Sequence, residues 1–193
     1  GSTRSVFWLD YTGLEFGAFQ DLELLLSRML DLSMVKVTLP AEPRNYIDPD
    51  PERESKIAEG FRSRFQEVLP ASFASIPRTF EPFADLVLNM VHLAALRALD
   101  SQGRVLQPVH SFCYTDGTGM ITLTGVVCQG EEVRQVRAIF SLLPFKHFDW
   151  APPLRIALPT LSTKERLHIQ RRLPCVKNPG RTLRRTLANL VDD

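Results

Sequence analysis

The chain has 193 residues, of which 44% are hydrophobic and 23% charged, and its formal net charge is +1. These values are typical of a soluble globular protein and exclude intrinsic disorder, collagen or a coiled coil as a description of the whole chain. The length predicts one domain with a sizeable core. No apolar run approaches the roughly 18 residues that a membrane-spanning helix needs, so we expect no membrane span.

The charge is unevenly distributed along the chain. Residues 1–150 carry 14 Lys and Arg against 19 Asp and Glu, a net −5, whereas residues 151–193 carry nine against three, a net +6. We therefore predict an α/β body over residues 1–150 and a basic strand-helix extension and tail over 151–193. The basic part could bind nucleic acid or an acidic partner, or dock on the body.

The cysteines do not form a disulfide framework. Cys113, Cys128 and Cys175 make an odd and sparse set, and no CxxC occurs. The histidines do not have the spacing of a zinc site, so we expect no metal. A reducing, cytoplasmic compartment fits this cysteine usage.

The first elements predict a βαβ unit. Residues 5–11 form a short apolar run, which is typical of a strand buried on both faces. Helical periodicity follows over residues 16–30. Residues 34–39 are rich in β-branched side chains, and Pro40 closes them. Strand, helix and strand in this order predict two parallel strands joined by a right-handed crossover.

Two helices and a β-hairpin follow. After a proline-rich loop, the periodicity predicts helices over residues 51–68 and 81–100, the second largely buried. Two β-rich runs, 104–114 and 120–128, flank a glycine-containing turn, which predicts the hairpin. With the turn centred on positions 117 and 118, Cys113 lies opposite about position 122 and Cys128 opposite about position 107, so the two do not pair.

The remaining segments are less regular. Residues 133–145 are compatible with either a strand or a short helix, and residues 154–158 alternate like a strand. Ser162 and Glu165 have the spacing of a capping box, which predicts the start of a basic helix that ends near Pro174.

Ligands of parallel α/β sheets bind beyond the carboxyl ends of the strands, so residues 10–13 and 38–42 are candidate site segments. Asp10 could accept a hydrogen bond from a ligand or act as a base, and Tyr11 could stack on a planar ligand. Alternatively, Asp10 caps the next helix and Tyr11 packs against it. The phosphate-binding motifs GxGxxG and GxxxxGK[ST] are absent.

A second candidate set lies on the hairpin. His110 and Tyr114 are four residues apart on a strand and therefore share a face, while Asp116 is in the turn. A catalytic dyad is one interpretation, and ordinary sheet packing is the other. Arginines of the basic tail could contact phosphates, namely Arg171, Arg172, Arg181, Arg184 and Arg185.

Several segments of the chain contain short motifs that match a known protein family. Residues 7–13 (FWLDYTG) resemble the W-L-D-Y-D-G stretch of a family of uncharacterised bacterial proteins named as O-methyltransferases, although this family tends to have Asp where Thr12 stands. Residues 112–117 and 120–127 (FCYTDG and MITLTGVV) resemble its hairpin motif. Residues 34–43, the helix around Leu88 and residues 154–174 match in the same order.

The resemblance implies a partial Rossmann-like sheet of the class I methyltransferase type, with parallel strands, a C-terminal antiparallel hairpin and flanking helices. It makes the first strand here the fourth of seven and implies that the chain is the C-terminal half of a truncated or split protein. The glycine-rich loop and the acidic residue that hold S-adenosylmethionine would then lie outside it. We expect that cofactor only in the full-length parent and none on this chain alone.

The same resemblance places Asp10 and Tyr11 at the catalytic edge. Candidate substrate-binding residues around them are Thr12, Gly13, Pro40, His110 and Tyr114. The first functional hypothesis is therefore half of a methyltransferase-like enzyme, inactive by itself.

A non-enzymatic interaction module is the alternative. An incomplete sheet exposes a strand edge, which a second copy or a partner protein would cover, while the basic tail binds a polyanion. We expect no membrane partner in either case.

Overall fold

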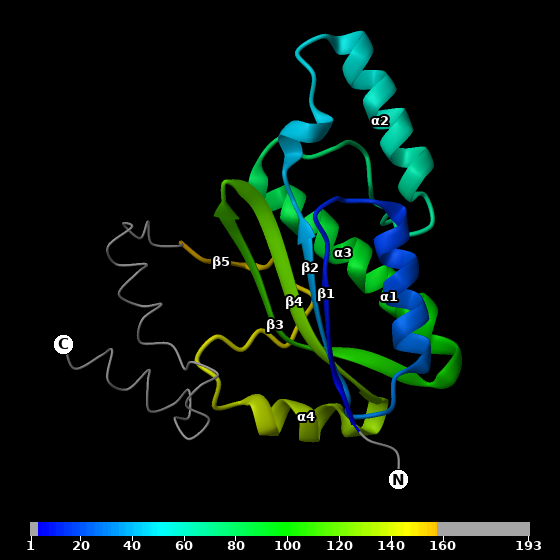
Figure 1. The fold of residues 1–193 in the computed structure, drawn as a ribbon, viewed down its shortest axis with the longest axis vertical. Coiled ribbons are helices and arrows are strands. Elements are labelled where there is room, and N and C mark those ends of the chain that lie inside the picture. The colour runs from blue at the N-terminus through cyan, green and yellow to red at the C-terminus, as the bar shows by residue number, and fades with distance from the viewer. Residues whose placement is uncertain (1–3, 158–193) are drawn as a thin grey trace, which may run out of the picture. The chain divides into compact units, whose positions relative to one another are not determined.

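The computed structural model describes residues 4–157 (Figure 1). The predicted capping box, the basic helix, Cys175 and the five tail arginines lie outside the described residues. Contacts between Cα atoms separate residues 1–157 and residues 158–193 into two units, of which only the first is described below. Its elements are β1 (Val6–Asp10), α1 (Phe16–Arg28), β2 (Met34–Pro40), η1 (Pro43–Tyr46), α2 (Pro51–Phe65), α3 (Phe80–Leu99), η2 (Asp100–Gln102), β3 (Arg104–Asp116), β4 (Thr118–Gln129), η3 (Gly130–Glu132), α4 (Val133–Phe140) and β5 (Leu154–Arg155).

The strands form one mixed sheet in the order β1-β2-β4-β3-β5. β1 and β2 are parallel and are joined through α1, which confirms the predicted βαβ unit. β4 is antiparallel to both β2 and β3, so the predicted hairpin is confirmed as well. The two-residue strand β5 runs parallel to β3. The predicted α/β class, with parallel strands, an antiparallel hairpin and flanking helices, is the observed one.

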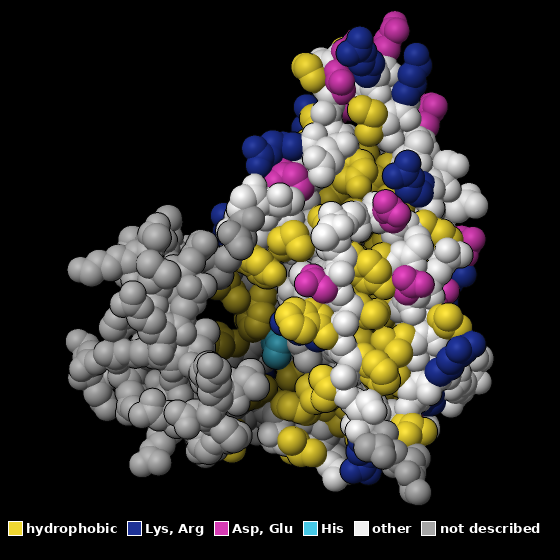
Figure 2. Space-filling view, viewed as in Figure 1, with side chains coloured by type: hydrophobic (Ala, Val, Ile, Leu, Met, Phe, Trp, Pro, Cys, Tyr) yellow, Lys and Arg dark blue, Asp and Glu magenta, His cyan; other side chains and the backbone are white. Residues whose placement is uncertain are grey.

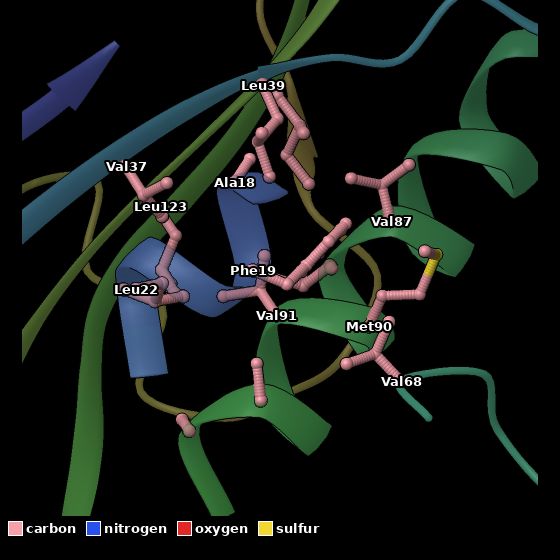
Figure 3. Close-up of a cluster of buried hydrophobic side chains, with 14 of the residues drawn as sticks. Ala18, Phe19, Leu22, Val37, Leu39, Val68, Val87, Met90, Val91 and Leu123 are labelled. Atoms are coloured by element: carbon pink, nitrogen blue, oxygen red, sulfur yellow. The ribbon is translucent and has the colours of Figure 1, made fainter. Parts of the chain in front are cut away.

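The main core lies between one face of the sheet and helices α1 and α3. Alternate residues of β2 point into this core because side chains along a strand alternate between its two faces. Val37 and Leu39 of β2 lie near Phe19 and Leu22 of α1, with Val87 of α3 beside them (Figure 3). All five side chains are buried, at 2% exposure or less.

Helix α3 supplies much of this core. Phe80–Gln102 is long and apolar enough to cross a membrane by length and composition alone, but 56% of its most apolar window is buried inside the protein. Phe83, Val87 and Met90 are fully buried, so the apolar character of α3 has a structural explanation in the core that it fills.

The opposite face of the sheet has a smaller cover. Val136 of α4 is buried, and Val133 and Phe140 pack beside it against Val126 and Cys128 of β4. This cluster covers the end of the sheet where β2 begins, since Met34 belongs to it. Figure 2 shows apolar side chains over the strand region of this view, and they include large exposed ones.

The first strand differs from its prediction. We expected β1 to be buried on both faces, but it is the edge strand of the described sheet. Val6 is 73% exposed, Phe7 37% and Trp8 64%, and only Leu9 packs against the main core. Burial depends on the neighbouring strands, and in the described part of the chain β1 has a neighbour on one side only.

The hairpin register also differs. The turn centres on Gly117, which has a left-handed φ of 73°, so Asp116 pairs with Thr118. Cys113 therefore faces Ile121 rather than position 122. A register shift between Pro108 and His110 then places Cys128 opposite position 105 rather than 107.

Both hairpin cysteines are buried and free, so the expectation that they do not pair is confirmed. Burial raises the pKa of both thiols and keeps them protonated at neutral pH. Residues 133–145, which the sequence left open, begin with the helix α4. The strand expected over residues 154–158 is limited to Leu154 and Arg155.

Candidate substrate site at the carboxyl edge of the sheet

The carboxyl ends of β1 and β2 lie together at one edge of the sheet. Asp10 is opposite Thr38, and the Tyr11 backbone N–H donates to the Thr38 carbonyl at 3.1 Å. Leu9 packs into the main core, so the alternation of the strand directs Asp10 to the face that α1 and α3 do not cover. Asp10 is exposed there. It does not cap α1, because the N-cap of that helix is Glu15.

Tyr11 turns the other way, toward α1. Its hydroxyl donates to Asp21 Oδ2 at 3.3 Å, and its ring lies against the main core. Burial, with the neighbouring charge and hydrogen bond of Asp21, raises the pKa of Tyr11 to about 12. The phenol is therefore protonated at neutral pH and can donate a hydrogen bond but cannot act as a base.

The end of β2 is fastened to the start of β4. Pro40, which is buried, faces Met120, and the Ala41 backbone N–H donates to the Gly119 carbonyl at 2.7 Å. Glu42 strengthens this junction, because its Oε2 accepts the Gly119 backbone N–H at 3.3 Å. Glu42 belongs to the candidate segment 38–42, although its position in the sequence indicates no particular role for it.

Glu42 also binds the first turn of η1. Its carboxylate accepts two hydrogen bonds from the Arg44 guanidinium, at 2.9 and 3.1 Å. These bonds, with the backbone N–H groups of Gly119 and Arg44, outweigh the effect of burial and lower the pKa of Glu42 to about 2. The carboxylate is 12% exposed and is ionised at any ordinary pH.

This depressed pKa predicts a loss of stability in acid. A carboxylate whose folded-state pKa lies below its unfolded value stabilises the fold fully above the unfolded pKa, and the contribution is lost as the pH falls through the folded value. We expect Glu42 to contribute about 1–2 kcal/mol above pH ~5 and to lose this contribution between about pH 5 and pH 2. Glu42→Gln should therefore flatten the pH dependence of the urea midpoint in this range.

The exposed Glu59 on α2 provides the matched control. Glu59→Gln should keep the pH dependence of the parent protein. If the Glu42→Gln and Glu59→Gln curves are indistinguishable, Glu42 does not hold the junction between β2 and β4.

The two hairpin candidates lie on the open face of the sheet but away from β1. His110 faces Thr124 and Tyr114 faces Met120, so they share a face as expected. Two strands, β2 and β4, separate β3 from β1. At about 4.8 Å per strand, β3 is about 14 Å from Asp10, so Asp10 and His110 do not form a contacting pair.

His110 is surrounded by sheet side chains. Its ring stacks on Phe112 at a centroid distance of 4.9 Å. Burial, together with the nearby Lys36 charge, lowers the pKa of His110, so its imidazole is neutral at pH 7. On the same face, the hydroxyls of Thr38 and Thr122 lie 3.1 Å apart, and Lys36 Nζ lies 4.4 Å from the centre of the Trp8 ring.

A surface hollow of about 680 Å³ is present beside α2. It lies between α2 and residues 75–78, and its lining residues include Tyr46, Ser55 and Ile76. The Tyr46 hydroxyl donates to the Leu14 carbonyl at 3.4 Å, which places one wall of the hollow next to residues 11–15. The volume is in the range of small-molecule sites, about 300–1,000 Å³. Sequence periodicity gives no signal for such a hollow.

The structure also brings Ser111 and His147 together, with 2.9 Å between Ser111 Oγ and His147 Nδ1. Ser111 is fully buried, so it is not accessible as a nucleophile. The pair fastens the segment after α4 to β3, where the His147 backbone N–H also donates to Val109. Residues 4–157 contain no group of three His, Cys, Asp or Glu that could hold a metal ion.

Comparison with known proteins agrees with this architecture. No curated protein matches the chain. A family model with the description "Putative O-methyltransferase" matches residues 1–189, which is nearly the whole chain. The chain belongs to this O-methyltransferase family.

Proposed function

We propose that the protein transfers a methyl group from S-adenosylmethionine to a hydroxyl oxygen of an acceptor bound at the carboxyl edge of β1 and β2. The observation that carries this proposal is the family match over residues 1–189. The parallel pair β1–β2 and the antiparallel hairpin β3–β4 support it, because the resemblance implies parallel strands followed by a C-terminal antiparallel hairpin.

The described residues do not fit a complete binding site for the cofactor. The turn between β1 and α1 has one glycine, Gly13, and a Cβ at that position would meet nothing closer than 3.4 Å, so no tight cradle is present there. The connection from β2 into η1 and α2 has no glycine. We therefore propose that residues outside this chain hold the cofactor and that they pair with β1.

The exposed side chains of β1 support this proposal. Val6, Phe7 and Trp8 project from both faces of an edge strand, and a strand that is apolar on both faces is typical of the interior of a covered parallel sheet. A further strand beside β1, with a layer over the open face, would bury all three side chains.

Asp10 and Tyr11 are the proposed acceptor-side groups. The exposed carboxylate of Asp10 accepts the proton that the acceptor hydroxyl loses on methylation. Tyr11, which remains protonated, positions the turn through its bond to Asp21. Thr12, Gly13 and Pro40 border the acceptor, and His110 and Tyr114 on the same face contact its distal part.

Calorimetric titration of S-adenosylmethionine into this chain and into the full-length protein tests both parts of the proposal. We expect binding by the full-length protein and none by residues 1–193 alone. Absence of binding in both would refute the enzyme proposal. Binding to residues 1–193 alone would instead show that this chain holds the cofactor and would remove the proposed role of the β1 edge.

A further inference from the structure

A lysine lies on the open face of the sheet, within the strand β2. The neighbouring Val35 and Val37 point into the main core, so the alternation of the strand directs Lys36 to the face that α1 and α3 do not cover. Lys36 pairs with Trp8 of β1 on one side and with Thr124 of β4 on the other, and its side chain is partly buried. Lysine is depleted in strands and is usually exposed, so this position calls for an explanation.

The ammonium group of Lys36 has no carboxylate partner. Among residues 4–157, none of the ion pairs includes Lys36. Its Nζ lies 4.4 Å from the centre of the Trp8 ring, and that side chain is itself 64% exposed. An aromatic face attracts an ammonium group but does not neutralise its charge. A partly buried cation in this state is stabilised by an anion that binds beside it.

The side chains beside Lys36 on β2, β4 and β3 are neutral and can form hydrogen bonds. The hydroxyls of Thr38 and Thr122 lie 3.1 Å apart, and Thr124 lies between Lys36 and His110 in the pairing of the strands. Burial and then the charge of Lys36 lower the pKa of His110, so the two side chains are near each other and the imidazole is neutral at pH 7. Hydroxyl groups and a neutral imidazole therefore adjoin the Lys36 charge.

Lys36 also lies between the groups that are proposed to contact the acceptor. Asp10 pairs with Thr38, two residues along β2 from Lys36, and strand geometry then gives about 8 Å between the Cα atoms of Asp10 and Lys36. His110 is two strands away on the other side, at about 10 Å. Figure 1 shows β2 and β4 between β1 and β3. An acceptor that extends from Asp10 toward His110 therefore passes over Lys36.

We propose that Lys36 binds a carboxylate of the methyl acceptor, so that the substrate is a hydroxy acid whose hydroxyl lies at Asp10 and whose carboxylate lies at Lys36. This inference rests on the proposed function for the hydroxyl and adds the anionic group. One ammonium group matches the single charge of a carboxylate, whereas the planar fork of arginine is the better match for phosphate. The exposed Trp8 ring beside the ammonium group favours an acceptor with an aromatic ring between its two polar groups.

Titration of small ligands into the chain, followed by NMR, tests the proposal. The probes are 4-hydroxybenzoate, its neutral analogue 4-hydroxybenzamide, and phenyl phosphate. The benzoate and the amide have nearly the same shape, so a difference between their affinities reports the charge. We expect 4-hydroxybenzoate to bind about tenfold more tightly than 4-hydroxybenzamide, because only the carboxylate forms a charge-assisted hydrogen bond with Lys36. Phenyl phosphate should bind no more tightly than 4-hydroxybenzoate.

Three variants identify the cation. Lys36→Met should bind 4-hydroxybenzoate and 4-hydroxybenzamide alike, and Lys36→Arg, which keeps the charge, should retain the preference for the benzoate. Lys56→Gln is the matched control, because Lys56 is exposed on α2 and its replacement removes the same charge from another part of the protein. This control should bind both ligands like the parent chain, and circular dichroism should show that all variants are folded.

The imidazole of His110 gives a second measurement, which a purely structural role of Lys36 would not change on ligand binding. Because the charge of Lys36 contributes to the low pKa of His110, a carboxylate bound at Lys36 should raise this pKa in the parent chain, and 4-hydroxybenzamide should not. In Lys36→Met the pKa should be raised already and should not respond to 4-hydroxybenzoate. NMR titration of the histidine ring signals measures these pKa values, with His110→Gln to assign the signal.

Three results would overturn the proposal. The first is 4-hydroxybenzoate that binds no more tightly than 4-hydroxybenzamide, including no binding of either. The second is an unchanged preference for the benzoate in Lys36→Met. The third is tighter binding of phenyl phosphate, which would assign the site to a phosphate instead.

These measurements need neither S-adenosylmethionine nor methyl transfer, so their failure is distinct from failure of the proposed function. Absence of cofactor binding by the full-length protein would remove the proposed function and leave the carboxylate site in place. Conversely, a full-length protein that methylates 4-hydroxybenzamide as fast as 4-hydroxybenzoate would keep the proposed function and remove the role of Lys36.

Discussion

Replacing Phe61 with alanine should lower the free energy of unfolding by about 3–5 kcal/mol, the usual cost of truncating a buried aromatic side chain. Phe61 is 3% exposed and lies at the centre of an aromatic cluster. Its ring contacts Tyr46, Phe65, Phe73 and Phe83 at centroid distances of 5.1, 4.7, 5.9 and 6.2 Å. A cavity at this position removes contacts from four neighbours at once, so we expect little local collapse to compensate for it.

Urea denaturation at neutral pH measures this loss, with Leu24→Ala as the control. Leu24 is 52% exposed on α1, so its truncation should change stability by no more than about 0.5 kcal/mol. A loss below about 1 kcal/mol for Phe61→Ala would mean that the aromatic cluster does not hold α2 against the rest of the fold.

The cluster also connects the core to the candidate site. Tyr46 stacks on Phe83 of α3 at 5.5 Å, and its hydroxyl donates to Leu14 next to the turn that follows β1. The hollow beside α2 therefore has one wall that is fixed by the core. The Phe61→Ala change should loosen this wall. We therefore expect backbone amides of residues 41–79 to exchange hydrogen faster in the variant than in the parent protein.

Local signals explain what the sequence predicted well. The βαβ unit was predicted from hydrophobic periodicity, and the hairpin from its glycine-containing turn. Both signals depend only on residues that are close together in the sequence. The exact hairpin register does not follow, because it depends on the left-handed φ of Gly117 and on the irregularity at Pro108. One residue of error at the turn moved the partner predicted for each cysteine by one position, and the irregularity at Pro108 moved the partner of Cys128 by one position more.

Burial of β1 could not be predicted, because it depends on neighbours that the pattern does not specify. The run Val6–Leu9 has the composition of an interior strand, but burial requires a neighbouring strand on each side. The described structure supplies one only, and Trp8 is 64% exposed. The contrast between interior composition and edge position is the physical basis for proposing that further chain pairs with β1.

Some residues of the candidate site could be predicted from their neighbours in the sequence, and others could not. Asp10 and Tyr11 were predicted as site residues from their position after a strand, and the structure places them at the carboxyl edge. Their catalytic roles remain predictions. Glu42 was assigned no role because its partner Gly119 is 77 residues away in the sequence. Only pairing of β2 with β4 brings these two residues together.

Replacing Gly119 with alanine should destabilise the protein by about 2–3 kcal/mol, as expected for an added methyl group without space. A Cβ at this position would lie 2.7 Å from Phe80 Cε2 and 2.8 Å from the Ala41 carbonyl oxygen. The backbone cannot move away freely, because the Gly119 carbonyl and N–H are bonded to Ala41 and Glu42. Relief of the clash therefore separates the start of β4 from the end of β2.

This separation should also change the behaviour of Glu42. With its bond to the Gly119 N–H lengthened, the carboxylate loses one of the groups that lower its pKa, so the stability lost between about pH 5 and pH 2 should be smaller in Gly119→Ala than in the parent protein. Urea midpoints measured across this pH range give both the loss of stability in Gly119→Ala and the change in its pH dependence.

Gly17→Ala is the matched control for this series. Gly17 lies within α1, and a Cβ there meets nothing within 4 Å. Alanine at this helical position should stabilise the protein by up to about 1 kcal/mol and leave the pH dependence unchanged. If Gly119→Ala is as stable as Gly17→Ala, the junction between β2 and β4 accommodates a side chain and the expected clash does not occur.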